Sequence, residues 1–398
     1  MKFLMWFLII YGILFVGFFY IGWRMISPLH LHQPYNSIAW IALFLLFLIL
    51  PLSMFMLRSG NEQWTDRIAW FTYTVMGFLS FLFTLLLIKD VLWVLGLGGH
   101  KLFTLIQTMS SSQKSVAQLD PNRRLFLTNM LNLGVLSLAG GFTMYGIFEA
   151  RRRPSIIEVD VPLPHLPDEF DGFRIVQITD IHAGLTVKRD FVETIVGMVA
   201  DLKADLIAFT GDLVDGSVAH LRKDVEPLSM LSAPHGKFFI TGNHEYYSGA
   251  IPWIEEAKRL GFDVLLNEHR VIERGNGKLL LAGVTDFTGG QFIESHKSSP
   301  EASVANAPQC DSRILLAHQP KSLFAALPHN FDLLITGHTH GGQFFPWNLI
   351  AAAGQPYIKG LHKHENTWIY VSKGTGYWGP PVRVAARSEI TVLRLVRG

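Results

Sequence analysis

Seven side chains that could bind metal ions follow five short apolar runs in the second half of the chain. They are Asp180, His182, Asp212, Asn243, His318, His338 and His340. The runs are four to seven residues long and rich in branched apolar side chains, which is typical of buried strands. In a sheet covered by helices, functional side chains gather beyond the carboxyl ends of the strands. We therefore expect all seven at one edge of the fold.

This mixture of carboxylate, amide and imidazole groups favours a pair of divalent cations. Two ions about 3.5–4 Å apart need several oxygen or nitrogen ligands, and a carboxylate can bridge them. Asp180 and His182 are two residues apart, as are the last two histidines, so each pair would lie on one side of an extended segment. Asp212 stands alone after its strand and suits the bridge, while Asn243 offers a carbonyl oxygen. Manganese, iron or zinc fits this ligand set better than calcium does.

The elements that must position these residues alternate between strand and helix patterns. This alternation predicts an α/β fold with central sheets covered by helices. Helical spacing occurs at 192–202, 253–260 and 321–327. The predicted strands are 173–179, 206–209, 237–240, 279–284, 313–317, 333–336, 369–372 and 390–395.

Residues 1–150 differ in composition from the rest and hold only 14 of the chain's 66 Asp, Glu, Lys and Arg residues. A membrane helix needs about 20 apolar residues. Spans of this kind lie near 3–23, 38–57, 68–88 and, more weakly, 125–148. Asn129 and Asn132 in the fourth span are expected to form hydrogen bonds between helices. We therefore predict an all-α, multi-pass membrane anchor of about four helices in 1–150, a linker in 151–171 and a globular domain in 172–398.

Composition also excludes several classes of protein. The net charge is +2 and the longest basic run is Arg151, Arg152 and Arg153, so we expect no nucleic-acid partner. Cys310 is the single cysteine, which excludes an intramolecular disulfide and a cysteine-based zinc site. The first three spans contain no Asp, Glu, Lys or Arg, which argues against a transporter or channel.

The metal-binding candidates, in this order, resemble the calcineurin-like metallophosphoesterase superfamily over roughly residues 174–395. With membrane helices in front of it, the chain looks like the bacterial transmembrane metallophosphoesterases, and the stretches at 374–376 and 380–383 fit that subgroup. The resemblance implies an αββα sandwich and two divalent ions, which could be manganese, iron, zinc or magnesium. It also implies hydrolysis through in-line attack by a metal-bridging hydroxide.

The resemblance further assigns roles to individual residues. One ion would be held by Asp180, His182 and His340, the other by Asn243, His318 and His338, and both by Asp212. His244 would not bind metal but would stabilise the phosphoryl oxygens or protonate the leaving oxygen. Asp215 would orient the His244 imidazole, as a third group orients a base in other enzymes. Arg383 is a candidate for contact with the substrate phosphate.

These features together predict a membrane-anchored, metal-dependent hydrolase of phosphoester or pyrophosphate bonds. Its substrate would be a phosphorylated small molecule or, because of the anchor, an amphiphilic or lipid-linked compound. One alternative is a UDP-2,3-diacylglucosamine pyrophosphatase in lipid A synthesis. Another is a non-catalytic, membrane-tethered binding or sensor module. The sequence does not indicate the oligomeric state.

The side of the membrane is a separate question. Lys and Arg residues divide six to six between the two sides, so the positive-inside rule does not choose. Residues 122–127 resemble a twin-arginine export signal, which favours the outer, periplasmic face of a bacterial inner membrane for the catalytic domain. The lipid A alternative requires the cytoplasmic face, so these two expectations conflict.

Overall fold

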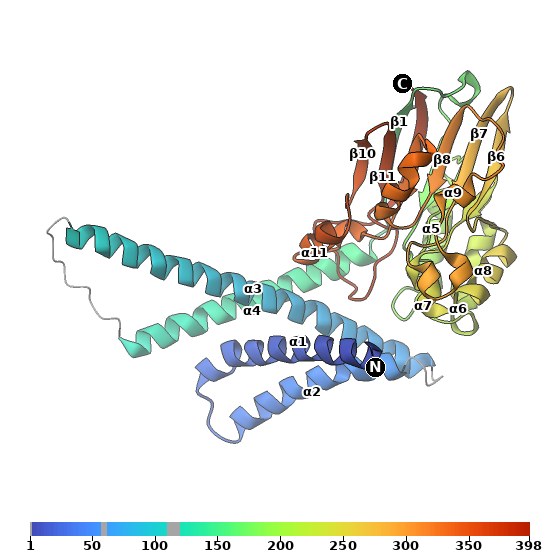
Figure 1. Ribbon diagram of the computed structural model, residues 1–398. Coiled ribbons are helices and arrows are strands. Elements are labelled where there is room, and N and C mark those ends of the chain that lie inside the picture. The colour runs from blue at the N-terminus through green and yellow to red at the C-terminus, as the bar shows by residue number, and fades with distance from the viewer. Residues whose placement is uncertain (1, 57–61, 110–119) are drawn as a thin grey trace. The chain divides into compact units, whose positions relative to one another are not determined.

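The computed structural model describes residues 2–56, 62–109 and 120–398, and the chain divides into two compact units. The first unit comprises Met1–Asn61 and Arg67–Tyr145, and the second comprises Glu62–Asp66 and Gly146–Gly398. Four long helices occupy the front of the chain: α1 (Lys2–Met25), α2 (Tyr35–Met56), α3 (Glu62–Met109) and α4 (Pro121–Arg151) (Figure 1). Each predicted membrane span falls almost entirely within one of these helices.

Three of the described helical segments are long and apolar enough to cross a membrane. They are Tyr11–Leu29, Asp66–Gly96 and Pro121–Arg151, and α2 contributes the shorter apolar stretch Tyr35–Ile49. Polar contacts connect the helices as expected. Nδ2 of Asn132 donates to the carbonyl of Arg24 at 2.7 Å, and Nδ2 of Asn129 donates to the carbonyl of Pro28 at 3.3 Å.

The second unit contains two six-stranded sheets. The first sheet has the order β1 (Ser155–Leu163), β12 (Glu389–Arg397), β2 (Arg174–Ile178), β3 (Leu206–Phe209), β4 (Lys237–Phe239) and β5 (Asp263–Val264). The second sheet has the order β10 (Gly360–His364), β11 (Thr367–Val371), β9 (Leu333–Thr336), β8 (Ser312–Leu316), β7 (Gly277–Gly283) and β6 (Glu268–Arg274).

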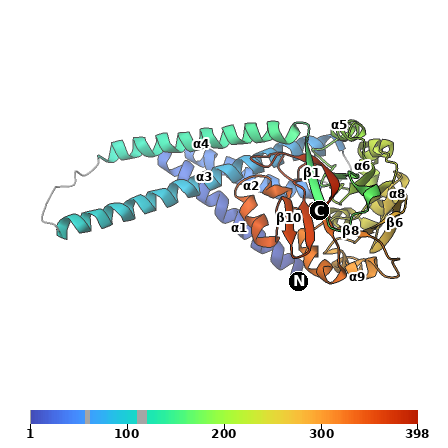
Figure 2. The same cartoon turned by 90° about the horizontal axis from the view of Figure 1, so that it is seen from above.

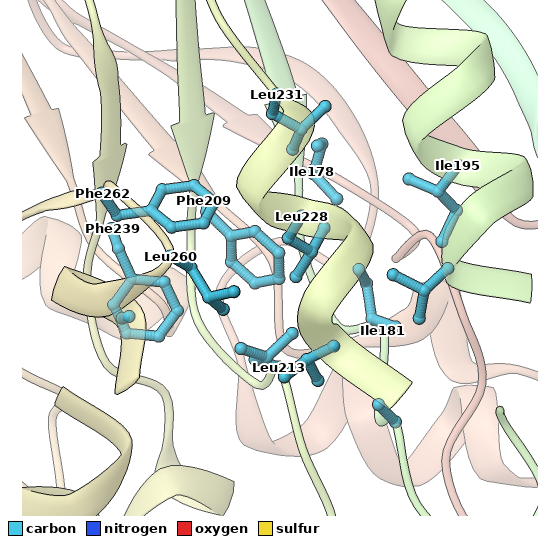
Figure 3. Close-up of a cluster of buried hydrophobic side chains, with 14 of the residues drawn as sticks. Ile178, Ile181, Ile195, Phe209, Leu213, Leu228, Leu231, Phe239, Leu260 and Phe262 are labelled. Carbon is cyan, nitrogen blue, oxygen red and sulfur yellow. The ribbon is translucent and has the colours of Figure 1, made fainter. Parts of the chain in front are cut away.

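The two sheets pack face to face, and helices cover their outer faces. Alternate residues of both sheets, such as Ile175, Leu206 and Ile314, form one buried cluster between them. The opposite face of the first sheet packs against α5 (Arg189–Ala200), α6 (Val218–Val225) and α8 (Ala250–Arg259), which gather on one flank (Figure 2). Figure 3 shows Ile178 and Phe209 of this face among side chains from the covering layer. On the second sheet, α10 (Leu323–Ala326) covers the outer face. This four-layer arrangement confirms the predicted αββα sandwich.

The predicted linker is wrong for residues 155–163, which form the edge strand β1. This strand pairs in parallel with β12 from Ser155 opposite Glu389 to Leu163 opposite Arg397. Its sequence alternates apolar and acidic residues, and the inward-facing Val161 and Leu163 are fully buried. Such alternation is the period-two pattern of a strand with one buried face. The globular fold therefore begins only a few residues after α4 ends.

The strands that precede the seven metal-binding candidates are neighbours within each sheet. In the first sheet, β2, β3 and β4 run in parallel with Ile178, Phe209 and Phe239 in register. In the second sheet, β8 and β9 are parallel, with Leu316 opposite Ile335. Because parallel strands that end in register deliver their following loops to one edge, each sheet contributes a row of loops to the site.

Candidate metal centre

The seven candidates come together where the carboxyl ends of the two sheets meet. Potential ligand atoms form three groups within which all atoms lie less than 4.8 Å apart. The groups are Asp180, His182 and His340; His182, Asp212 and His244; and Asp212, His318 and His338. Four of these residues come from loops of the first sheet and three from loops of the second, so neither sheet could form the site alone.

Asp212 lies close to candidate ligands of both expected ion sites. Its Oδ2 is 3.0 Å from Nε2 of His318 and 3.8 Å from Nε2 of His182. The same Nε2 of His182 lies 3.0 Å from Nε2 of His340. This placement supports the bridging role expected for the carboxylate.

Asn243 supplies a further sign that these residues fit cations. Its side-chain Oδ1 is buried and has no hydrogen-bond partner among the described residues. A buried polar atom without a partner is costly unless another group, such as a metal ion, satisfies it. Carboxylate, amide and imidazole donors in this proportion fit a pair of divalent cations.

The backbone reaches this arrangement by a route that differs from the expected extended segments. Five of the seven residues adopt the left-handed conformation. Their φ values are 54° for Asp180, 53° for His182, 54° for Asp212, 71° for His338 and 51° for His340. Asp and His tolerate this region better than most residues, yet each such residue costs of order 1–3 kcal/mol. Concentration of this strain in the ligand loops is typical of a functional site.

Hydrogen bonds hold several ligands in position. Nδ1 of His318 lies 2.7 Å from the carbonyl of Thr210, which leaves Nε2 directed at Asp212. The Asp180 carboxylate accepts from the Thr179 hydroxyl at 2.6 Å and from the backbone N–H of His338 at 3.0 Å. Such contacts around a metal site fix the orientation and tautomer of the ligands.

Glu245 is a fully buried acid whose carboxylate accepts hydrogen bonds from the backbone of the ligand loops. Its carboxylate accepts from the backbone N–H groups of Asp212 at 2.9 Å, Leu213 at 2.8 Å and Gly242 at 2.7 Å. It therefore ties the loop that carries Asp212 to the start of α7 (Asn243–Ser248).

Two glycines are required because other groups approach them closely. A Cβ added at Gly337 would collide with the carboxylate of Asp180 and the hydroxyl of Thr179. Gly211 has a φ of +88°, and a Cβ there would meet the backbone of Gly242. Side chains at these positions would push the ligand loops apart.

His244 and Asp215 form the expected pair. Nδ1 of His244 makes a short hydrogen bond to Oδ1 of Asp215. The other carboxylate oxygen of Asp215 lies 3.2 Å from Nδ1 of His182, so Asp215 contacts both a candidate ligand and the candidate catalytic imidazole. Because Nδ1 of His244 is engaged, Nε2 is the nitrogen that can meet a substrate oxygen.

The charges around the site shift several pKa values. Burial disfavours a charge on Asp212, but the imidazoles of His318 and His244 hold the pKa of its carboxyl well below its usual range. Asp212 therefore stays ionised and ready to bind cations. Burial lowers the pKa of His244, but the carboxylates of Asp212 and Asp215 outweigh it and raise this pKa to about 9. A protonated His244 can donate to a substrate oxygen.

Arg383 does not lie where a substrate phosphate could reach it. The residue is fully buried, and its guanidinium donates to the carbonyls of Gly376, Ala386 and Lys373. Nη2 also lies 2.9 Å from Nδ1 of His340. The expectation of direct substrate contact is therefore replaced by a positioning role behind a candidate ligand. The sequence around Arg383 does not indicate this burial. The burial depends on the packing of the loop that carries Arg383 against His340.

Aromatic side chains surround His244, and two of them, Tyr247 and Phe292, were not among the predicted site residues. The rings of Tyr247 and Trp378 have their centroids 5.1 Å and 5.7 Å from that of His244, and Phe292 contacts Tyr247 at 5.6 Å. All three are exposed, at 61% for Tyr247, 51% for Trp378 and 51% for Phe292. Tyr247 lies in α7 and belongs to no sequence motif that would have marked it as a site residue. The site thus has a polar, buried floor and an aromatic rim.

Comparisons with known proteins agree with this geometry. The family model for calcineurin-like phosphoesterases matches residues 173–342. A transmembrane protein with metallophosphoesterase domain from Danio rerio is 32% identical over 402 residues, covering 96% of this chain and 87% of the relative. An uncharacterized metallophosphoesterase from Helicobacter pylori (strain ATCC 700392 / 26695) is 38% identical, covering 69% of this chain and 73% of the relative.

A solved structure, a dimetal phosphatase from Danio rerio, shares 12% identity with a TM-score of 0.34, covering 55% of this chain and 91% of that chain. This likeness is too weak to bear on function. The sequence relatives are decisive, and their names, together with the apolar helices, support membrane association. The chain belongs to the calcineurin-like metallophosphoesterase family and is a metal-dependent phosphoester hydrolase.

Proposed function

We propose that this protein is a membrane-anchored, dinuclear-metal hydrolase that cleaves a phosphoester or pyrophosphate bond in an amphiphilic or lipid-linked substrate. The observation that carries the proposal is the sharing of residues between ligand groups. Asp212 belongs to two of the three groups, and His182 joins the remaining one to it. A single ion would not require ligands spread over such linked groups, whereas two neighbouring ions would.

The residues of each ion site follow from these groups. Asp180, His182 and His340 would hold one ion, and His318, His338 and Asn243 the other, with Asp212 shared. When bound, two divalent cations would supply a nucleophile from water at neutral pH and neutralise the charge that develops on phosphorus. Manganese, iron, zinc and magnesium are all compatible with these donors.

His244 would act on the substrate directly, and Asp215 would act through His244. Asp215 holds Nδ1 of His244, which directs Nε2 towards the rim of the site. We assign to Nε2 the donation of a proton to the leaving oxygen. Asp215 orients the imidazole and favours its protonated form, as its contribution to the raised pKa of His244 supports.

The amphiphilic character of the substrate is argued from two features. Helix α4 belongs to an apolar segment of 31 residues and leads directly into the sandwich, with β1 beginning at Ser155. The aromatic rim formed by Tyr247, Trp378 and Phe292 offers apolar surface beside His244. A phosphorylated compound with an apolar part would contact both the ions and this rim.

The test combines metal content with activity. The full chain, purified in detergent, is offered bis-p-nitrophenyl phosphate with manganese, and bound metal is measured by mass spectrometry. We expect close to two ions per chain, with Asp212→Asn losing metal and activity together. The matched control is Asp263→Asn, which removes a carboxylate paired with Arg270 outside the ligand groups and should retain both. Failure of the wild type to bind any divalent ion would contradict the proposal and favour the binding-module alternative.

Two narrower questions are tested separately. A nucleotide sugar carrying two acyl chains, UDP-2,3-diacylglucosamine, should release UMP if the lipid A alternative holds. If protein that cleaves the generic diester releases no UMP, the lipid A alternative is eliminated.

For the orientation in the membrane, we propose that the sandwich faces outward across a bacterial inner membrane. The test is a reporter domain fused after Gly398. If the reporter is active in the cytoplasm and inactive outside it, the sandwich faces the cytoplasm and the proposed orientation is wrong.

A further inference from the structure

An exposed apolar helix lies beside the metal centre. Residues 341–358 contain no Asp, Glu, Lys, Arg or His, and they include α11 (Trp347–Gly354), of which no residue is buried. Its large side chains face outward, with Leu349 58% and Ile350 59% exposed, and Phe345 just before it is 45% exposed. A surface helix of a water-soluble domain normally buries its apolar stripe. Here Leu349 and Ile350 remain exposed.

This helix is directly connected to the metal centre. The turn η8 (His340–Gly342) begins with a candidate ligand, and α11 starts seven residues after that ligand. A Cβ added at Gly342 would collide with the backbone of Asn348, so the turn and the helix are tightly packed. Whatever covers α11 therefore lies next to the turn that carries His340.

The same segment is linked to the end of α4 through hydrogen bonds within the second unit. The backbone N–H of Val384 donates to the carbonyl of Gln343 at 2.9 Å. The neighbouring N–H of Arg383 donates to the carbonyl of Gly146 at 2.9 Å. Gly146 is part of the apolar segment Pro121–Arg151, which is long enough to cross a membrane. These two hydrogen bonds connect the segment just before α11, through residues 383 and 384, to the last turns of α4. The residues that form them all belong to the second unit.

We propose that α11 inserts its apolar side chains into the head-group region of the bilayer in which this protein is anchored. Phe345, Trp347, Leu349 and Ile350 would lie among the lipid head groups and upper acyl chains. Tryptophan is enriched at this depth, and the binding of a surface helix strengthens with the apolar area that it buries in the membrane. The entrance to the metal centre would then open at the bilayer surface, where an amphiphilic substrate resides. The inference rests on the proposed membrane anchoring and lipid-linked substrate class.

Spin labelling tests this placement without requiring turnover. In the full chain, Cys310→Ser removes the single cysteine, and Leu349→Cys introduces a nitroxide site. The protein is reconstituted at low density in vesicles of phosphatidylcholine and phosphatidylglycerol. We expect the ratio of collision rates with oxygen to those with a water-soluble nickel chelate to be several-fold higher than at a control site. Ile350→Cys provides a second label position should the first variant fold poorly.

The control site is Met230→Cys. Met230 is 77% exposed and precedes β4, at the opposite edge of the sheet from the ligand loops. Equal accessibility to the chelate at positions 349 and 230 would overturn the proposal. Strong dipolar broadening between labels at 349 would also overturn it, because a second copy of the chain would then cover the helix.

Activity on bis-p-nitrophenyl phosphate, measured on the same labelled samples, keeps this inference separate from the proposed function. A protein that inserts α11 but hydrolyses no phosphoester contradicts only the proposed function. A protein that hydrolyses the soluble diester while its 349 label stays in water contradicts only the membrane contact.

Discussion

The proton-donating role assigned to His244 makes a prediction that depends on the leaving group. The variants are His244→Gln and Asp215→Asn, alone and combined, and the substrates are two diesters that differ only in the basicity of the departing oxygen. p-Nitrophenolate leaves without protonation, whereas an alkoxide must be protonated. We therefore expect His244→Gln to slow the alkyl ester far more than the nitrophenyl ester.

The magnitudes follow from the contacts of the pair. General acid catalysis contributes roughly 100- to 10,000-fold, so His244→Gln should reduce kcat for the alkyl ester within that range. The bond between Nδ1 of His244 and Asp215 is charge-assisted, and such bonds contribute about 1.5–3 kcal/mol. Loss of that amount corresponds to about 10- to 150-fold in rate, the effect expected for Asp215→Asn.

The double variant tests whether Asp215 acts through His244. If it does, removing Asp215 from a chain that already lacks His244 should cost nothing further in kcat. Rates are measured at saturating manganese with metal content checked in parallel, because Asp215 also lies 3.2 Å from Nδ1 of the candidate ligand His182. The control is His269→Gln, which removes a partly buried imidazole near the carbonyl of Ser303, outside the site.

Two results would refute this reasoning. Equal losses for both leaving groups would mean that His244 stabilises the phosphoryl oxygens and does not protonate the leaving oxygen. A double variant whose loss is the product of the two single losses would mean that Asp215 acts independently of His244, through the metal-binding residues.

Three further predictions concern the metal centre and its supports. Chelation should lower the midpoint of thermal unfolding, because ions at 100 times their dissociation constant stabilise the fold by about 2.7 kcal/mol; an unchanged midpoint would contradict this. Gly337→Ala should destabilise the fold by about 1–3 kcal/mol and release metal, since its Cβ collides with Asp180, while Gly197→Ala, with open space around it, should be harmless in both assays. Arg383→Lys should lower kcat or metal affinity by roughly 10- to 100-fold through His340 and leave KM unchanged. A raised KM at constant kcat would instead indicate that Arg383 contacts the substrate directly.

Much of the site follows from the sequence because strand ends and ligand types are local properties. Buried strands such as Ile175–Ile178 are visible as branched apolar runs, and the residues that follow them must lie at the sheet edge. Asp180, Asp212 and His318 could therefore be named before any coordinates. The apolar spans of the anchor are equally local, since crossing a membrane requires length and composition alone.

β1 is an edge strand that lies within the predicted linker. Its alternation of apolar and acidic residues from Ile157 to Val161 is a strand pattern, yet its partner β12 lies more than 200 residues further along the chain. An edge strand is recognisable only when a partner is available to bury one of its faces. The short distance from α4 to the sandwich follows from that pairing.

Local sequence was enough to identify the candidate metal-binding side chains, the alternation of strands and helices, and the apolar front of the chain. How those side chains meet depends on the folded arrangement. The left-handed backbone of five candidate ligands, the burial of Arg383 against His340 and the exposure of Leu349 and Ile350 in α11 all depend on contacts between segments distant in sequence. A residue's type and neighbours set its local preference, but only packing between the two sheets can hold strained backbone in place and determine which surfaces remain exposed.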